Sequence, residues 1–163
     1  MNIKKMQPND WEQVASIYQE GIDTGNATFE TQCPPWEVWD EKHRKDCRFV
    51  AKENDKIAGW IALSGVSVRA VYSGVCEVSV YIASEFKNKG VGSLLMQALI
   101  EESERHGIWT LQAAIFPENE ASIHLHEKFG FRQVGIREKI GKREGIWRDN
   151  VFLERRSKIA GIE

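Results

Sequence analysis

The chain has 163 residues, 42% of them hydrophobic, which suits one compact domain spanning residues 1–163 with its own core. Its 22 lysines and arginines nearly balance 24 aspartates and glutamates, so the formal net charge is −2 at pH 7. This balance provides no basic field for nucleic acid or for an anionic membrane surface, so we expect neither partner. The N-terminus lacks the apolar run of a signal peptide, and no stretch has the length and hydrophobicity of a membrane span.

Three cysteines, Cys33, Cys47 and Cys76, are odd in number and widely spaced, and no Cys-x-x-Cys motif occurs. This pattern is typical neither of a disulfide framework nor of a zinc site. It favours small buried side chains in a reducing compartment. We therefore expect a cytoplasmic protein that binds no metal.

The first third of the chain predicts two helices and three strands. In order, the pattern indicates a strand at 3–6, a helix from Asn9 or Asp10, a helix from Pro35 to Lys45 or Asp46, and strands at 48–51 and 57–63. Residues 26–35 have turn-forming sequences at both ends and are expected to form a loop between the helices. Residues 53–56 are expected to close a hairpin between the two later strands.

The central stretch, residues 76–107, predicts a strand, a glycine loop and a long amphipathic helix. Val78, Val80 and Ile82 alternate with Glu77, Ser79 and Tyr81, which is the period of a strand with one buried face. Residues 87–93 then bring two glycines to the start of a helix that ends at Gly107. Unpaired amides and the positive end of the helix dipole at such a start favour a phosphate.

Two common phosphate-binding motifs do not fit this loop. A P-loop needs Gly-Lys-Ser/Thr, whereas Gly92 is followed directly by Ser93. A dinucleotide fingerprint needs a third glycine at the position of Leu95 and should lie early in a βαβ unit. An ordinary strand-to-helix turn remains an alternative for this stretch alone.

The last third of the chain predicts a strand at 109–116, a helix from Asn119 to Gly130, and strands at 134–140 and 146–153. The complete order is β-α-α-β-β-β-α-β-α-β-β, without an internal repeat. That order predicts an α/β fold in which helices cover a mixed sheet.

The segment Lys87-x-x-Gly90-Val91-Gly92 after a Val-x-Val strand resembles the acetyl-CoA-binding segment of the GNAT acyltransferase superfamily, where the first residue is usually Gln or Arg. The helix from Asn119 through Ser122 to Gly130-Phe131 is similar to a second conserved helix of that superfamily. The resemblance implies the GNAT fold, a single domain with a mixed, mostly antiparallel sheet flanked by helices.

A narrower resemblance covers nearly the whole chain, to the phosphinothricin and methionine sulfoximine/sulfone N-acetyltransferase branch. Its marks are the segments 27–30 (Ala-Thr-Phe-Glu), 77–82, 125–127 (Leu-His-Glu) and 145–149 (Gly-Ile-Trp-Arg-Asp). One departure concerns the two arginines, separated by a proline, that often precede a tyrosine in the branch. Here only Arg69 precedes Tyr72, which weakens recognition of an amino-acid carboxylate.

The chemistry that the resemblance implies is acyl transfer from a thioester to an amine. An ammonium group must lose a proton before it attacks, and Glu77 is the candidate general base, directly or through a water. A solvated glutamate on a strand face is the alternative. His126 occupies the helix position where many GNAT enzymes have a tyrosine, so it is the candidate acid for the leaving thiolate, with simple packing as its alternative.

The resemblance also implies two sets of binding residues. The cofactor set comprises Val80, Tyr81, Ile82, Lys87, Asn88, Lys89, Gly90, Val91, Gly92, Ser93, Asn119 and Ser122. The substrate set comprises Phe29, Glu30, Arg69, Tyr72, Glu77, Ser79 and Trp147. The branch further implies a homodimer, with Trp147 and the final strand as candidates for the contact.

We therefore expect an acetyl-CoA-dependent N-acetyltransferase that uses no metal and acts on a small amino-acid-like amine. Two alternatives stay open. One is acetylation of a protein N-terminus or lysine, which needs an open peptide groove. The other is a CoA-binding sensor without turnover, which would need the glycine loop but not Glu77.

Overall fold

The computed structural model describes all of residues 1–163, and its elements follow the predicted order. They are β1 (Asn2–Lys5), α1 (Trp11–Asp23), α2 (Trp36–Lys42), β2 (His43–Glu53), β3 (Lys56–Gly65), β4 (Val75–Ile82), α3 (Val91–Arg105), β5 (Thr110–Ile115), α4 (Glu120–Lys128), β6 (Arg132–Arg143) and β7 (Ile146–Arg156). Short 3₁₀ turns lie at Pro8–Asp10, Ala70–Tyr72 and Ser84–Phe86. The prediction of a single α/β chain with this order is confirmed.

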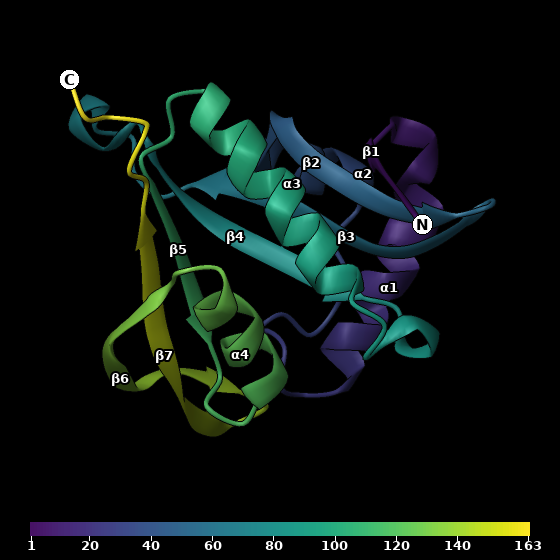
Figure 1. The fold of residues 1–163 in the computed structure, drawn as a ribbon. Helices are drawn as coiled ribbons and strands as arrows, with labels where there is room; N and C mark the ends of the chain where they lie inside the picture. Colours follow the sequence, from purple (N-terminus) through teal and green to yellow (C-terminus); the bar gives the residue numbers. More distant parts are fainter.

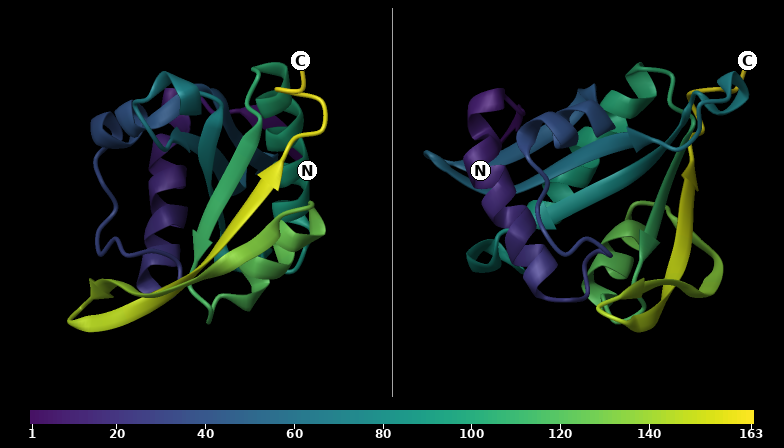
Figure 2. Two further views of the ribbon diagram at one scale, coloured as in Figure 1. Left: turned by 90° about the vertical axis from the view of Figure 1, so that its left-hand side faces the viewer. Right: turned by 180° about the vertical axis from the view of Figure 1, so that it is seen from behind.

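The seven strands form one sheet in the order β1-β2-β3-β4-β5-β7-β6, and every neighbouring pair is antiparallel except β4 with β5. Helix α3 crosses one face of the sheet, while α1 and α2 lie on the other (Figure 1). Figure 2 shows the β6–β7 hairpin extending beyond the rest of the sheet. None of the helices combines the length and the apolar character needed to cross a lipid bilayer.

The main core lies between α3 and the first four strands. Leu95 and Leu99, four residues apart on α3, are completely buried, as are Ile61 and Leu63 of β3. The opposite face of the same strands carries a layer of aromatic rings. Trp60 of β3 contacts rings from both α1 and α2 there. The sheet that positions the site is therefore packed on both faces.

Strands β4 and β5 separate soon after they pair. Their parallel ladder has only three residue pairs, and the last joins Glu77 to Gln112. On its other edge β4 stays paired with β3 as far as Ile82. The amide of Ala83 donates to the carbonyl of Ala58, and antiparallel bonding alternates along a strand. The backbone groups of Val80 and Ile82, which lie beyond the last ladder pair, therefore point into the gap between β4 and β5.

The second helix is shorter than the sequence predicted. It ends at Lys42, and His43 already belongs to β2, whereas we expected the helix to reach Lys45 or Asp46. The buried guanidinium of Arg48 explains the early end, because it donates to the carbonyls of Asp40 (3.0 Å) and His43 (2.8 Å). The carbonyls that a longer helix would use are thus capped by a side chain from the next strand. The final two strands are also longer than predicted.

Candidate active site

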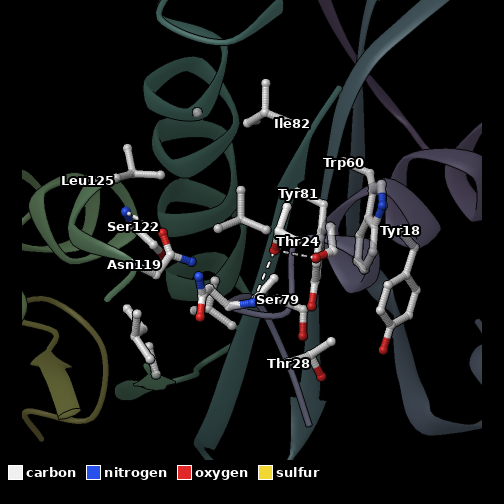
Figure 3. A pocket seen from close by; sticks show the side chains of 18 of the residues that line it. Tyr18, Thr24, Thr28, Trp60, Ser79, Tyr81, Ile82, Asn119, Ser122 and Leu125 are labelled. Atoms are coloured by element: carbon white, nitrogen blue, oxygen red, sulfur yellow. Dashed lines mark hydrogen bonds between the residues drawn. The ribbon is translucent and has the colours of Figure 1, made fainter. Parts of the chain in front are cut away.

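A cleft of about 770 Å³ opens where β4 and β5 separate. Its walls come from β4, the glycine loop, the starts of α3 and α4, the faces of α1 and α2, and the loop of residues 24–30. Figure 3 shows Tyr18, Trp60 and Tyr81 on one side of the cleft, with Asn119, Ser122 and Leu125 on the other. Segments from both halves of the sheet thus meet around one cavity.

The place where β4 and β5 separate is here called the fork. Glu77 lies at its base, in the last residue pair before the strands diverge. It is half-buried, lines the cleft, and makes no side-chain hydrogen bond or ion pair within the chain. Burial raises the pKa of Glu77 above its ordinary value, and the opposing positive charges of Lys42 and Arg137 reduce that rise. A carboxylate with a raised pKa and free lone pairs is suited to accept a proton from a bound amine.

Ser64 of β3 pairs with Glu77 of β4, and His43 of β2 pairs with Ser64. The three side chains therefore form one row across the sheet. All three line the cleft. The Nδ1 atom of His43 lies 2.7 Å from the carbonyl of Trp39, and burial lowers the pKa of His43 to about 4. This histidine is therefore neutral at pH 7 and adds a polar group without a charge.

An aromatic wall lies beside this row. The rings of Trp60 and Tyr81 are stacked with centroids 4.9 Å apart, and Tyr18 lies 4.8 Å from Tyr81. Burial raises the pKa of Tyr18 to about 12, and it raises the pKa of Tyr81 as well. Both hydroxyls therefore keep their protons at neutral pH and can donate hydrogen bonds into the cleft.

The glycine loop forms the other end of the cleft. Gly90 adopts the left-handed conformation (φ +78°) that leads into α3, and glycine takes this conformation without strain. At Gly92 an added Cβ would lie 2.9 Å from Cδ2 of Leu125, so a larger residue there would displace the Leu125 side chain of α4. The amides of the first turn of α3 are left for a ligand.

Most of the predicted cofactor residues line the cleft. They are Val80, Tyr81, Ile82, Lys87, Asn88, Gly90, Val91, Gly92, Asn119 and Ser122. Lys89 and Ser93 are not part of the wall. The ammonium of Lys89 lies over the ring of Phe86, and Ser93 accepts a hydrogen bond from Lys128. The side chain of Asn119 caps α4 by accepting a hydrogen bond from the amide of Ser122 (3.3 Å), as the sequence predicted.

His126 lies in the cleft wall with only 2% of its surface exposed. Its Nδ1 lies 2.7 Å from the carbonyl of Ser122, which requires the proton to be on Nδ1. The Nε2 atom is buried and has no partner within the chain. Burial lowers the pKa of His126, so the ring is neutral at pH 7 and keeps a free lone pair.

The substrate residues predicted from the sequence divide into two groups. Phe29, Glu30, Glu77 and Ser79 line the cleft together. Arg69, Tyr72 and Trp147 do not, and the structure places them on the surface. Tyr72 is 45% exposed and its ring lies below the guanidinium of Arg69, while Trp147 is 53% exposed near the end of the β6–β7 hairpin.

Several residues of the cleft were not among the predicted site residues. Lys42 is one of them, and together with the predicted Lys87, at the other end, it supplies the only lysine or arginine side chains of the wall. Asn150 of β7 is buried in the wall, and its Oδ1 atom has no partner within the chain. No periodic pattern marked Lys42 as a site residue, because it lies at a helix end that we expected three or four residues later. Asn150 follows the alternation of the strand around it, but it belongs to no motif that would mark it as a site residue.

Outside the cleft, Asp46, Cys47 and His106 bring potential metal ligands within 4.8 Å of one another. Arg44 already binds both carboxylate oxygens of Asp46, at 2.9 Å and 2.7 Å. Burial raises the pKa of the Cys47 thiol to about 12, which opposes formation of the thiolate that a metal requires. These residues are therefore poorly suited to hold a metal.

Comparison with known proteins identifies the family. Residues 11–131 match the model of the acetyltransferase (GNAT) family. The phosphinothricin N-acetyltransferase of Alcaligenes faecalis is 30% identical over 164 residues, which cover 94% of this chain and 81% of the relative. The chain belongs to the GNAT family and is an N-acetyltransferase.

Solved structures agree with this assignment. A ribosomal-protein-alanine N-acetyltransferase from Brucella melitensis superposes with a TM-score of 0.89 at 26% identity, covering 96% of this chain and 100% of the other. A phosphinothricin acetyltransferase from Sinorhizobium meliloti, solved with acetyl-CoA, superposes with a TM-score of 0.88 at 24% identity, covering 99% and 91% of the two chains. The second match shows the shared fold alone. The predictions of the GNAT fold and of the phosphinothricin branch are confirmed.

The raised pKa of Glu77 predicts a pH-dependent effect of Glu77→Gln on stability. Burial penalises the charged carboxylate, so this group stabilises the fold fully only below its unfolded pKa of 4.5 and loses that contribution as pH rises through its folded pKa. Glutamine carries no charge at any pH. We expect Glu77→Gln to be more stable than the wild type in urea unfolding at pH 8, with the difference shrinking below pH 4. A gain of equal size at both pH values would contradict the burial of this charge.

Proposed function

We propose that the protein transfers an acetyl group from acetyl-CoA to the amino group of a small amino-acid-like acceptor of the phosphinothricin, methionine sulfoximine or methionine sulfone type. The observation that carries the proposal is the position of Glu77 at the base of the fork, with a phosphate-type glycine loop at one end of the cleft and a walled pocket at the other. The likeness to the Alcaligenes faecalis enzyme supports the acceptor class.

The donor would occupy the side of the cleft formed by β4, α3 and α4. The amides at the start of α3 are suited to the pyrophosphate, and Lys87 is the cation at this end. The backbone N–H groups of Val80 and Ile82 point into the gap between the strands and are suited to the thioester carbonyl. Asn119 and Ser122 would meet the pantetheine arm.

The reaction would then need two proton transfers. Glu77 takes a proton from the acceptor's ammonium, directly or through a water, and the free amine attacks the thioester carbonyl. The C–N bond forms, the oxyanion is held by backbone N–H groups, and the C–S bond breaks as the intermediate collapses. The attack leaves a second proton on the new amide nitrogen. Nε2 of His126, whose lone pair is free because burial lowers the pKa of the ring, would accept that proton and pass it to the leaving thiolate.

The acceptor end contains charges of both signs. Glu30 and Glu77 are suited to an ammonium group, and Lys42 is the cation nearest to them in the wall. A carboxylate on the acceptor would therefore meet Lys42, which supplies a positive charge where the branch often uses a second arginine. The tight pocket between loop 24–30 and α2 suits a small molecule better than a peptide.

The first test is thiol release from acetyl-CoA with a panel of acceptors: phosphinothricin, methionine sulfoximine, methionine sulfone, their α-amides, ordinary amino acids, polyamines and short peptides. We expect turnover with the first three and weaker turnover with the amides, which lack the carboxylate for Lys42. Glu77→Gln should lower kcat/KM about 100-fold or more at pH 7, as loss of a general base does. Turnover confined to peptides, or wild-type rates in Glu77→Gln, would refute the proposal.

His126→Phe separates proton donation from packing. The substitution keeps a ring against Phe131, which His126 contacts at a centroid distance of 4.9 Å, and removes the unpaired Nε2 atom. We expect kcat to fall about 10-fold to 100-fold with little change in KM for acetyl-CoA, since general acids contribute on this scale. An unchanged kcat would remove His126 from the mechanism.

We also propose that the protein is a homodimer that uses the β6–β7 hairpin. Strand β6 is an exposed edge strand of 12 residues, and Ile136, Ile140, Ile146 and Trp147 of the hairpin expose apolar surface. A second copy of the chain that covers this surface would also bury the side chain of Trp147. Light scattering should give a mass of two 18.7-kDa chains, and Trp147→Glu should give one. A monomeric wild type would contradict the proposal.

A further inference from the structure

The loop of residues 24–30, here called the acceptor loop, forms a wall of the cleft without any regular structure of its own. All of its residues except Gly25 line the cleft. Residues 26–34 make no backbone–backbone hydrogen bond. Within the loop, only the hydroxyls of Thr24 and Thr28 bond to the backbone of Asn26 and Glu30. Its shape therefore depends on side chains that reach it from elsewhere.

Arg143, near the end of β6, is one of these side chains. Its guanidinium donates to the carbonyl of Thr28 (3.1 Å) and to the carbonyl of Ile22 at the end of α1 (2.9 Å). The side chain is only 10% exposed, although it also lies 3.6 Å from the exposed carboxylate of Glu144. A single planar cation thus ties the middle of the acceptor loop to the last turn of α1.

Arg148, on β7, holds the first part of the loop. It donates to the carbonyl of Gly25 (2.9 Å) and to the side chains of Asn26 (2.8 Å) and Glu118 (3.2 Å). Its guanidinium also lies 4.1 Å from the centroid of the Phe116 ring. Phe116 in turn packs edge to face against Phe29 of the acceptor loop, with centroids 4.8 Å apart.

These contacts join the two halves of the sheet that the fork separates. Helix α1 packs on β3 and β4, whereas β6 and β7 belong to the half beyond β5. The partners in the arginine contacts are 115 to 123 residues apart in the chain. Gly141 of β6 completes the contact, because an added Cβ there would lie 3.0 Å from the ring of Phe29. The acceptor loop therefore continues from α1, which packs on one half of the sheet, and is held at Gly25, Thr28 and Phe29 by side chains of the other half.

We propose that Arg143 and Arg148 are positioning residues that hold the acceptor loop in place and thereby set the affinity for the amine acceptor. They do this by bonding the carbonyls of Gly25 and Thr28, which no backbone amide satisfies, and the carbonyl of Ile22, which also accepts from the amide of Gly25. The proposal rests on the proposed function, since it assigns the acceptor to the side of the cleft that this loop walls. On the donor side, Arg143 bonds no residue of α3 or α4, and Arg148 reaches only Glu118, which precedes the cap of α4.

The test compares Arg143→Gln and Arg148→Gln with Arg132→Gln as the matched control. Arg132 lies on the same strand as Arg143, but its ion pair with Glu154 (2.6 Å) is exposed and does not touch the loop. For each variant, hydrogen exchange of the hydrogen-bonded loop amides, those of Gly25, Asn26 and Glu30, is measured together with KM for acetyl-CoA, KM for the acceptor, and kcat. Arg143→Lys and Arg148→Lys keep the charge and test whether a single ammonium restores the loop in part.

We expect faster exchange in the loop and a rise of about 10-fold to 100-fold in KM for the acceptor, the scale of losing charge-assisted hydrogen bonds. KM for acetyl-CoA and exchange in α3 should stay within about twofold of the control, because a general loss of structure would move all of them together. Partial recovery in the lysine variants would support a role for the charge.

Two results would overturn the inference. Unchanged exchange of these loop amides would show that the arginines do not hold the loop, whatever the kinetics. Faster exchange with an unchanged KM for the acceptor would show that the loop does not set acceptor affinity. A wild type that acetylates no amine would instead refute the proposed function, and the exchange measurement alone would then decide whether the arginines hold the loop.

Discussion

The early separation of β4 from β5 is the constraint on which the rest of the site depends. A parallel ladder that stops at Glu77 and Gln112 leaves the backbone groups of the next residues without a strand partner. Backbone groups that are buried without partners are costly, so the gap must be filled by water or by a ligand. The cleft exists because neither strand closes on the other and the two halves of the sheet continue in different directions.

Several polar groups of the cleft wall have no partner within the chain. The carboxylate of Glu77 makes no hydrogen bond, Nε2 of His126 and Oδ1 of Asn150 are buried and unpaired, and the first amides of α3 have no capping side chain. A buried polar group of this kind lowers the stability of the fold, because its hydrogen-bonding capacity is not used within the chain. Functional sites often retain this kind of cost, since the same groups become useful when substrate is bound.

The aromatic layer and the arginine contacts hold the walls of the cleft at a fixed distance. Trp60 stacks on Tyr81 within the sheet, and Tyr18 packs on both from α1. On the far side, Arg148 rests on Phe116, which contacts Phe29. Large rings and planar cations resist compression, so the acceptor end keeps its shape without regular secondary structure in the loop.

Much of this architecture was predictable from local sequence. The two glycines at the start of α3 and the Asn119 cap each act over a few residues, and the structure has both where expected. The alternation of buried side chains in β4 holds at Val78 but is lost at Val80 and Ile82, which border the cleft. The end of α2 was not predictable, because Arg48 caps it from a different element.

Side-chain positions that depend on distant segments were also beyond the sequence. The motif around Arg69 and Tyr72 gave no sign that both would lie on the surface outside the cleft. The contacts of Arg143 and Arg148 join segments more than 100 residues apart, so no local pattern could reveal them. The position of Lys42 in the cleft wall depends on where α2 ends, and the sequence placed that end three or four residues too late.

The most direct test of this account is a crystal structure of the protein with acetyl-CoA. The account predicts that the pantetheine arm lies in the gap between β4 and β5, with the pyrophosphate at the start of α3. The thioester carbonyl should lie about 3 Å from a backbone N–H of Val80 or Ile82, a normal hydrogen-bond distance. Acetyl-CoA bound elsewhere, with the gap empty or closed, would contradict the claim that the fork is the active site.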